Sequence, residues 1–132
     1  MFENFNYPPL QVKRYFAAAT NDLRLAKSTT EPELIFYACY NLIVKVAVAV
    51  CAKNNLRVKS RVGHHRELIN KLAELLANQD IEIIADKMRI KRNRDLYDGG
   101  ALVSKKEAAF YLSFCANLIM KVDSYLFPNK LL

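Results

Sequence analysis

The segment Leu34–Ala52 constrains the fold of this chain more than any other part of the sequence. It is almost continuously apolar, and its length approaches the roughly 20 residues that a helix needs to cross a bilayer. Asn41 and Lys45 interrupt it near the middle, four residues apart and therefore on one face of a helix. A lysine at that depth costs about 2.5–3.5 kcal/mol to insert into hydrocarbon. We therefore expect the segment to form the central helix of a bundle, and not a membrane span.

The rest of the chain shows helical periodicity and contains few residues that break helices. Only 3 glycines and 4 prolines are present while 52% of the residues are hydrophobic, which argues against a many-stranded sandwich or barrel. Capping-box spacing occurs at Thr30 with Glu33 and at Ser104 with Glu107. The pattern predicts one all-α domain, residues 1–132, folded as an antiparallel up-and-down bundle of four to five helices. The expected helices span about 9–27, 30–53, 68–76, 81–98 and 104–127.

The cysteines indicate a reducing environment. Cys39, Cys51 and Cys115 each lie in an apolar run and show no C-x-x-C spacing. We expect buried thiols and neither a metal nor another cofactor, because metal sites need clustered Cys or His ligands. No phosphate-binding glycine loop, H-E-x-x-H or G-x-S-x-G motif occurs. Residues 1–9 lack the basic-then-apolar order of a signal peptide, so we expect a cytoplasmic location.

The charge balance favours a polyanionic partner. Lys and Arg number 20 against 13 Asp and Glu, a net charge of +7 that suits RNA, a nucleotide or an acidic protein surface. Crowding of like charges within residues 87–94 suggests that an anion binds there, whereas the structural alternative is a solvated helix face paired with nearby aspartates. Half of the basic residues fall in two groups: Lys53, Arg57, Lys59, Arg61 and Arg66, and then Lys87, Arg89, Lys91, Arg92 and Arg94.

Arg92 is expected to face the bundle. At about 100° per residue it falls in register with Ile84 and Met88, on the apolar stripe of its helix. An arginine in that position needs a partner, which we expect to be Asp95, a neighbouring helix or a groove at an oligomer interface. An adjoining polar ridge, at four-residue steps, consists of Arg89, Asn93 and Tyr97.

This ridge supplies groups that suit a nucleic-acid site. Guanidinium, amide and phenol groups can bind phosphate and can stack on or hydrogen-bond to a base. Packing and helix capping are the structural alternative for the same residues. Aromatic side chains within the apolar segments are instead expected to pack in the bundle or at a dimer interface. These are Tyr37, Tyr40, Phe110 and Phe114.

The chain resembles the HEPN superfamily of small helical-bundle proteins over nearly its full length. The resemblance rests on the helix order, on the Gly63-His64-His65 step before the third helix, and on residues 91–98 (Lys-Arg-Asn-Arg-Asp-Leu-Tyr-Asp) at the end of the fourth. It implies a homodimer whose fourth-helix motifs face each other across a cleft. Many members are metal-independent ribonucleases, or toxins paired with a minimal nucleotidyltransferase antitoxin. Their signature is an arginine, usually followed by a polar residue, with a histidine four to six residues further on.

Carried over to this sequence, the signature places Tyr97 where the family has histidine, after Arg92 and Asn93. A phenol with a pKa near 10 is about 0.1% ionised at pH 7, so it cannot replace imidazole as a base. His64 or His65 would supply the imidazole if either folded beside Arg92; packing or capping of the third helix is the alternative.

The resemblance therefore implies an HEPN-like dimer that binds RNA or another polyanion, with degenerate or absent ribonuclease activity. One alternative is the toxin or substrate-binding partner subunit of a separate nucleotidyltransferase, and another is a structural dimer without a ligand. The candidate catalytic residues are Arg92, Asn93 and Tyr97, and the candidate anion-binding residues are Arg89, Arg94, Lys87, Lys91, Arg57, Lys59 and Arg61.

Overall fold

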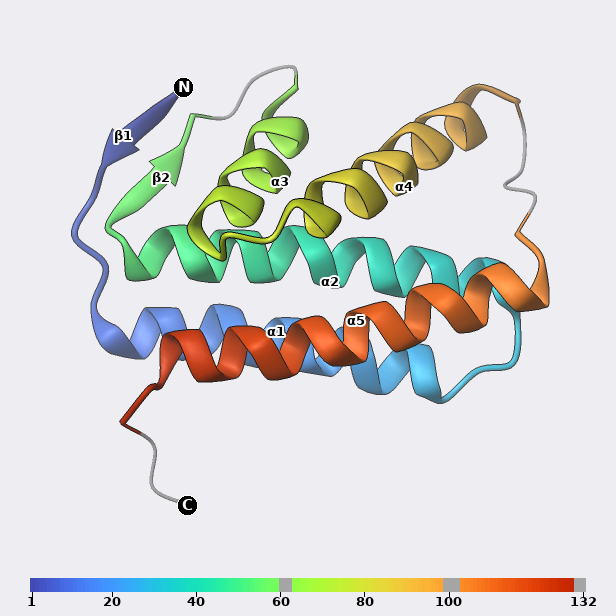
Figure 1. Ribbon diagram of the computed structural model, residues 1–132, viewed down its shortest axis with the longest axis horizontal. Helices are drawn as coiled ribbons and strands as arrows, with labels where there is room; N and C mark the ends of the chain where they lie inside the picture. Colours follow the sequence, from blue (N-terminus) through green and yellow to red (C-terminus); the bar gives the residue numbers. More distant parts are fainter. Residues whose placement is uncertain (60–62, 99–102, 130–132) are drawn as a thin grey trace.

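The chain folds into a helical bundle with a small two-stranded sheet (Figure 1). The computed structural model describes residues 1–59, 63–98 and 103–129, and for residues 95–98 it describes the backbone alone. In chain order the elements are β1 (Phe2–Asn4), α1 (Pro9–Lys27), α2 (Pro32–Lys53), β2 (Leu56–Val58), α3 (His64–Leu75), α4 (Gln79–Asp98) and α5 (Lys105–Leu126).

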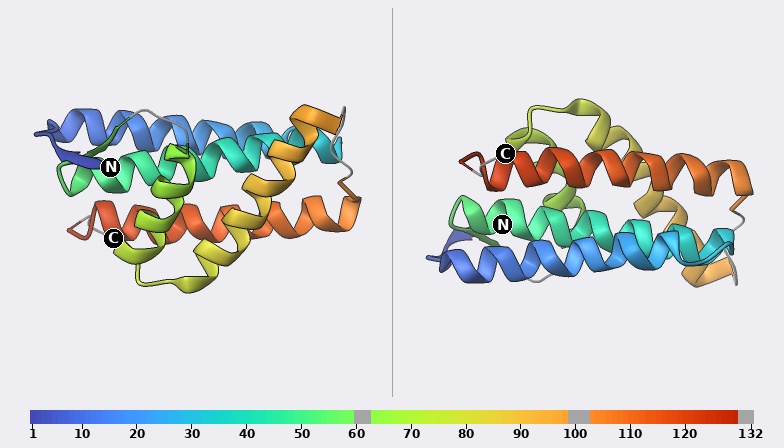
Figure 2. Two further views of the ribbon diagram at one scale, coloured as in Figure 1. Left: turned by 90° about the horizontal axis from the view of Figure 1, so that it is seen from above. Right: turned by 90° about the horizontal axis from the view of Figure 1, so that it is seen from below.

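Helix α2 lies at the centre of the fold and contacts the other four helices. The long helices α1 and α5 lie along it, and α1 runs opposite to both α2 and α5 (Figure 1). Helices α3 and α4 form a hairpin that packs on another side of α2 and opens as a V, with the start of α3 and the end of α4 at its open side (Figure 2, left). The end of α4 lies near the end of the bundle at which α2 begins, and the start of α3 lies further along the bundle (Figure 2, left).

Burial of α2 agrees with its expected place in the bundle. Half of its residues are fully buried, and Phe36, Ile43 and Val50 have no exposed surface. Among the described residues, α2 is the helix long and apolar enough to cross a membrane, and 61% of its most apolar window is buried. Length and composition alone are weak evidence for a span, since the core helix of a bundle meets the same criterion.

The polar interruption of α2 is accommodated by α1. Lys45 Nζ lies 2.9 Å from Asp22 Oδ2, and the Asp22 side chain is only 7% exposed. Asn41 lies on the exposed side of α2. The pair is a specific contact between α1 and α2, because a buried carboxylate is tolerated only when it is paired.

The cysteines are free and buried, as expected. Burial raises the pKa of Cys51 to about 12, so the thiol stays protonated at physiological pH. Cys115 Sγ lies 3.6 Å from the Cys39 carbonyl oxygen, between α5 and α2. These thiols are packing residues of the core.

The helix starts show which local signals were correct. The capping box at Ser104 and Glu107 is present, with bonds of 3.0 and 3.1 Å in the two directions. The box expected at Thr30 is wrong, because α2 begins at Pro32 and its N-cap is Glu31, which has no side-chain capping bond. Helix α3 begins at His64, four residues earlier than Leu68, because Gly63 takes a left-handed conformation (φ 85°) that starts the turn there.

The sheet is the one element type that the sequence pattern did not predict. β1 and β2 pair antiparallel, with Phe2 opposite Val58 and Asn4 opposite Leu56. Across the sheet, Arg57 forms an ion pair of 2.8 Å with Glu3 and lies 4.3 Å from the centre of the Phe5 ring. The connection between α2 and α3 is thereby tied to the N-terminal segment.

Candidate functional site

Arg92 faces the bundle from α4, as its register predicts. Ile81, Ala85 and Met88 on the same stripe are buried, and the half-buried Arg92 continues the stripe by one turn. Its guanidinium carbon lies 5.3 Å from the centre of the Tyr40 ring, which belongs to α2 and is 1% exposed. The partner of Arg92 is therefore a neighbouring helix, and the contact is a cation–π interaction.

Tyr40 also connects this arginine to a histidine of α3. The Tyr40 hydroxyl and His65 Nδ1 are hydrogen-bonded at 3.0 Å, and the two rings lie 5.8 Å apart. The His64 ring contacts His65 edge-on, with ring centres 4.6 Å apart. The fold thus brings an imidazole to the same buried tyrosine ring that Arg92 covers.

The surroundings of His65 disfavour its charged form. Burial lowers the pKa of His65, and the positive charges of His64, Arg92 and Arg89 lower it further. For Tyr40, burial raises the pKa of the phenol, against the opposing effect of Arg92 and Arg89. Both groups of this hydrogen bond are consequently neutral near pH 7, and the positive charge is carried by the arginines.

A pocket of about 250 Å³ lies directly beside these residues, between the start of α3 and α4. Residues from the start of α3 and from α4 form its lining. The first N–H groups of a helix lack partners within the helix and attract anions. The lining residues are Gly63, His64, His65, Arg66, Arg89 and Asn93.

The cations of α4 are not equivalent in their partners. Arg89 Nε donates to Asp86 Oδ1 at 2.8 Å, and its side chain is 19% exposed. That bond uses one of the five N–H donors of the guanidinium. Lys91 Nζ bonds to Glu107 Oε2 of α5 at 3.2 Å, which ties the two helices together. Arg89 thus lines the pocket, whereas the Lys91 charge is directed to α5.

The other basic residues that the sequence singled out are distributed over the surface. Lys87 lines a separate hollow of about 410 Å³ next to α5, and Arg94 and Lys59 are exposed. Arg57 is held in the sheet by Glu3. Arg61 and the side chains of Tyr97 and Asp95 lie outside the described residues. Of the expected site, Arg89 and Asn93 therefore line this pocket. Arg92 is connected to it through the Tyr40 ring, whose hydroxyl is bonded to the pocket residue His65.

Tyr40, Gly63 and Arg66 belong to this site, although sequence reasoning did not propose them for it. Tyr40 was expected to pack in the core, and it does, but its hydroxyl needs a partner at that depth. The signal for Gly63 was its place directly before two histidines. Arg66 was counted among the basic residues of the connection, whereas it lies in the first turn of α3.

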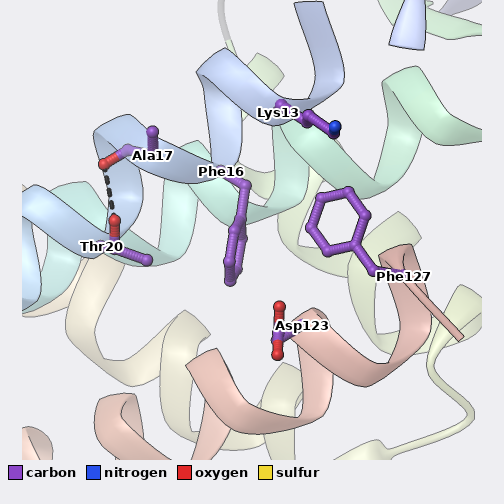
Figure 3. Close-up of a pocket in the computed structure, with 6 residues that line it drawn as sticks. All are labelled: Lys13, Phe16, Ala17, Thr20, Asp123 and Phe127. Carbon is purple, nitrogen blue, oxygen red and sulfur yellow. Dashed lines mark hydrogen bonds between the residues drawn. The ribbon is translucent and has the colours of Figure 1, made fainter. Parts of the chain in front are cut away.

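Another hollow, of about 520 Å³, lies between α1 and α5, away from the α4 residues (Figure 3). Phe16 and Phe127 form its walls, with ring centres 5.8 Å apart in an edge-to-face arrangement. The Thr20 hydroxyl is occupied by a 2.8 Å bond to the Ala17 carbonyl. This lining is mainly apolar and lacks the grouped cations of the α3–α4 pocket.

Comparison with known proteins adds no further constraint. No family model, curated protein or solved structure matches the chain. Within the described residues, no three His, Cys, Asp or Glu side chains are grouped so that they could hold a metal ion. The chemistry of the site must therefore be argued from its own guanidinium, amide, imidazole and phenol groups.

Proposed function

We propose that the chain is an HEPN-like helical bundle that binds RNA or a related polyanion in the pocket between the start of α3 and α4. The observation that carries the proposal is that Arg66, Arg89 and Asn93 line the same pocket as the first turn of α3. Two guanidinium groups, an amide and a helix N-terminus all recognise phosphate oxygens. The net charge of +7 would further raise the association rate with a polyanion.

The direct test is the RNA affinity of pocket variants in EDTA. Arg89→Ala and Asn93→Ala remove pocket groups, and Arg14→Ala removes one exposed positive charge from α1 as a matched control. We expect Arg89→Ala to weaken binding about tenfold and to reduce the slope of log affinity against log salt by about 0.7, the value for one lost contact to a single-strand phosphate. Equal affinities for the Arg89 and Arg14 variants would contradict a pocket-based site.

The same experiment reports on catalysis. RNA cleavage without metal needs a base near neutrality, and His65 is the described imidazole hydrogen-bonded to Tyr40 below Arg92. Because Tyr97 stands where the family signature has histidine, the proposal is for binding with degenerate or absent cleavage. Cleavage in EDTA that disappears in Arg92→Ala would instead show that the site is a ribonuclease.

Homodimerisation is part of the proposal. Ile83 and Ile90 lie two turns apart on one face of α4 and are 49% and 42% exposed, with Asp86 and Lys87 on the turn between them. A second copy packed on these two isoleucines would bring two α4 helices together, as the resemblance implies. Ile90→Asp is expected to convert a dimer into a monomer in light scattering, whereas Leu25→Asp on α1, similarly exposed at 44%, should leave it unchanged. A monomeric parent protein would refute this part.

A further inference from the structure

His65 is placed where its protonation and an anion in the pocket must influence each other. The imidazole lines the pocket, and charged or titratable groups face it from three helices. Tyr40 of α2 is bonded to Nδ1, His64 is its neighbour on α3, and Arg89 and Arg92 approach from α4. Two described carboxylates belong to the same helices: Asp86 of α4 is paired with Arg89, and Glu67 lies in the first turn of α3.

In the empty site the positive charges oppose protonation of His65. Burial removes solvation of the imidazolium, and the neighbouring histidine and arginines repel it. An anion in the same pocket reverses the balance of charge, because it attracts both the arginines and an imidazolium. Protonation would also make Nδ1 a donor, to which the Tyr40 hydroxyl can respond by acting as acceptor.

We propose that a phosphodiester group of RNA binds in the α3–α4 pocket together with a proton taken up by His65. The inference rests on the proposed function, since it requires RNA to bind in this pocket. It specifies the ligand as the anionic backbone, held by Arg89, the first turn of α3 and the imidazolium. It also makes RNA binding dependent on pH in the range where histidine titrates.

The direction of the pH dependence follows from linkage. Free protein has a His65 pKa below the ordinary 6.5, and RNA-bound protein has a higher one. Affinity is therefore constant above the bound-state pKa, rises as the pH falls between the two values, and is constant again below the free-state pKa. A single proton limits the change to about tenfold in affinity per pH unit.

The probe is a 2′-O-methyl oligouridylate with hydroxyl ends. It carries diester phosphates alone, which do not titrate between about pH 5 and pH 8, so any proton taken up in that range belongs to the protein. It also lacks the 2′-hydroxyl needed for metal-independent cleavage, so the measurement reports binding only. Because the chain has 2 histidines, each imidazole can be followed separately by NMR.

The experiment measures the pKa of both imidazoles with and without the oligonucleotide, and the affinity between about pH 5.5 and pH 8. His64→Gln assigns the resonances, and His65→Gln keeps an acceptor for Tyr40 but cannot titrate. We expect the pKa of His65 to rise by about one unit on binding, and the affinity to rise about fivefold to tenfold at the lower pH. The affinity of His65→Gln should lose most of this pH dependence, while Arg14→Ala, on the exposed side of α1, retains it.

The outcomes separate this inference from the proposed function. If the oligonucleotide binds and Arg89→Ala weakens it, but the pKa of His65 does not move, proton uptake is wrong and the RNA site stands. If the oligonucleotide does not bind at any pH, both fail. Should His65→Gln not fold, the NMR titration of the parent protein decides the question alone.

Discussion

In the part of the chain that the structure describes, two arginines lie over aromatic rings, and their surroundings assign them different roles. Arg57 lies 4.3 Å from the Phe5 ring centre, and its guanidinium pairs with Glu3 at 2.8 Å. Arg92 lies 5.3 Å from the Tyr40 ring centre, and that ring is bonded to His65 next to a pocket. A carboxylate neutralises the first arginine, whereas the second adds to a group of cations. Both residues are arginines in contact with an aromatic ring. Their roles differ because Glu3 neutralises Arg57, whereas Arg92 lies over a ring that is bonded to His65.

The two pairs differ most in how deeply the aromatic ring is buried, and replacing the ring should therefore give the largest difference in stability. Tyr40 is 1% exposed and Phe5 is 39% exposed. Tyr40→Ala should lower the free energy of unfolding by about 3–5 kcal/mol, because it empties a buried aromatic site. Phe5→Ala should cost about 1 kcal/mol or less. Urea unfolding of both variants measures the difference. Equal losses in the free energy of unfolding would contradict it and would mean that the two arginine–aromatic pairs stabilise the fold equally.

Mild acid should destabilise the protein through His65, which is bonded to the ring beneath Arg92. The lowered pKa of His65 means that the unfolded chain binds its proton first as the pH falls. Stability therefore declines from about pH 6.5 down to the lowered pKa of His65. We expect the Tm of the RNA-free protein to fall over this window, and His65→Gln to reduce the fall.

The carboxylate of Glu107 provides a comparison, because it affects stability at a lower pH than His65 does. The pKa of Glu107 is lowered, first by its hydrogen bond from the Ser104 backbone and then by Lys91. Its contribution to stability is present above its ordinary value of 4.5 and is lost at more acidic pH. A Tm that is flat between about pH 7.5 and pH 5.5 and falls only below that range would contradict the role assigned to His65.

The smallest effect is expected from the ion pair in the sheet. The Arg57 and Glu3 side chains are 46% and 39% exposed, so solvent screens their attraction. A double-mutant cycle with Arg57→Ala and Glu3→Gln should give a coupling of about 0.2–1 kcal/mol that declines with added salt. A coupling above about 2 kcal/mol would show that the pair is a larger structural element than its exposure implies.

Sequence patterns predicted the helices well because the signals for them are local. Pro9 and Pro32 begin α1 and α2, and the bounds of those helices were predicted within two residues. The sheet was missed because each strand has three residues, too few to establish an alternating pattern. The first turn of α3 was missed because it is polar, and apolar periodicity begins at Leu68.

In the candidate site, too, the features with a local sequence signal were predicted and the others were not. The inward position of Arg92 follows from helical periodicity alone, and the structure confirms it. The meeting of His65 with Tyr40 depends on how the α3–α4 hairpin crosses α2, which involves residues 25 positions apart. No local pattern encodes that crossing. The sequence could therefore propose an imidazole at the site but could not place it.

The most direct test of the account compares the RNA affinities of Arg92→Ala and Arg57→Ala. Each variant removes one positive charge from an arginine–aromatic pair, so the change in net charge is the same. The account predicts a loss of about tenfold for Arg92→Ala and of less than about twofold for Arg57→Ala at moderate salt. Equal losses, or a larger loss for Arg57→Ala, would contradict an RNA site built on α4.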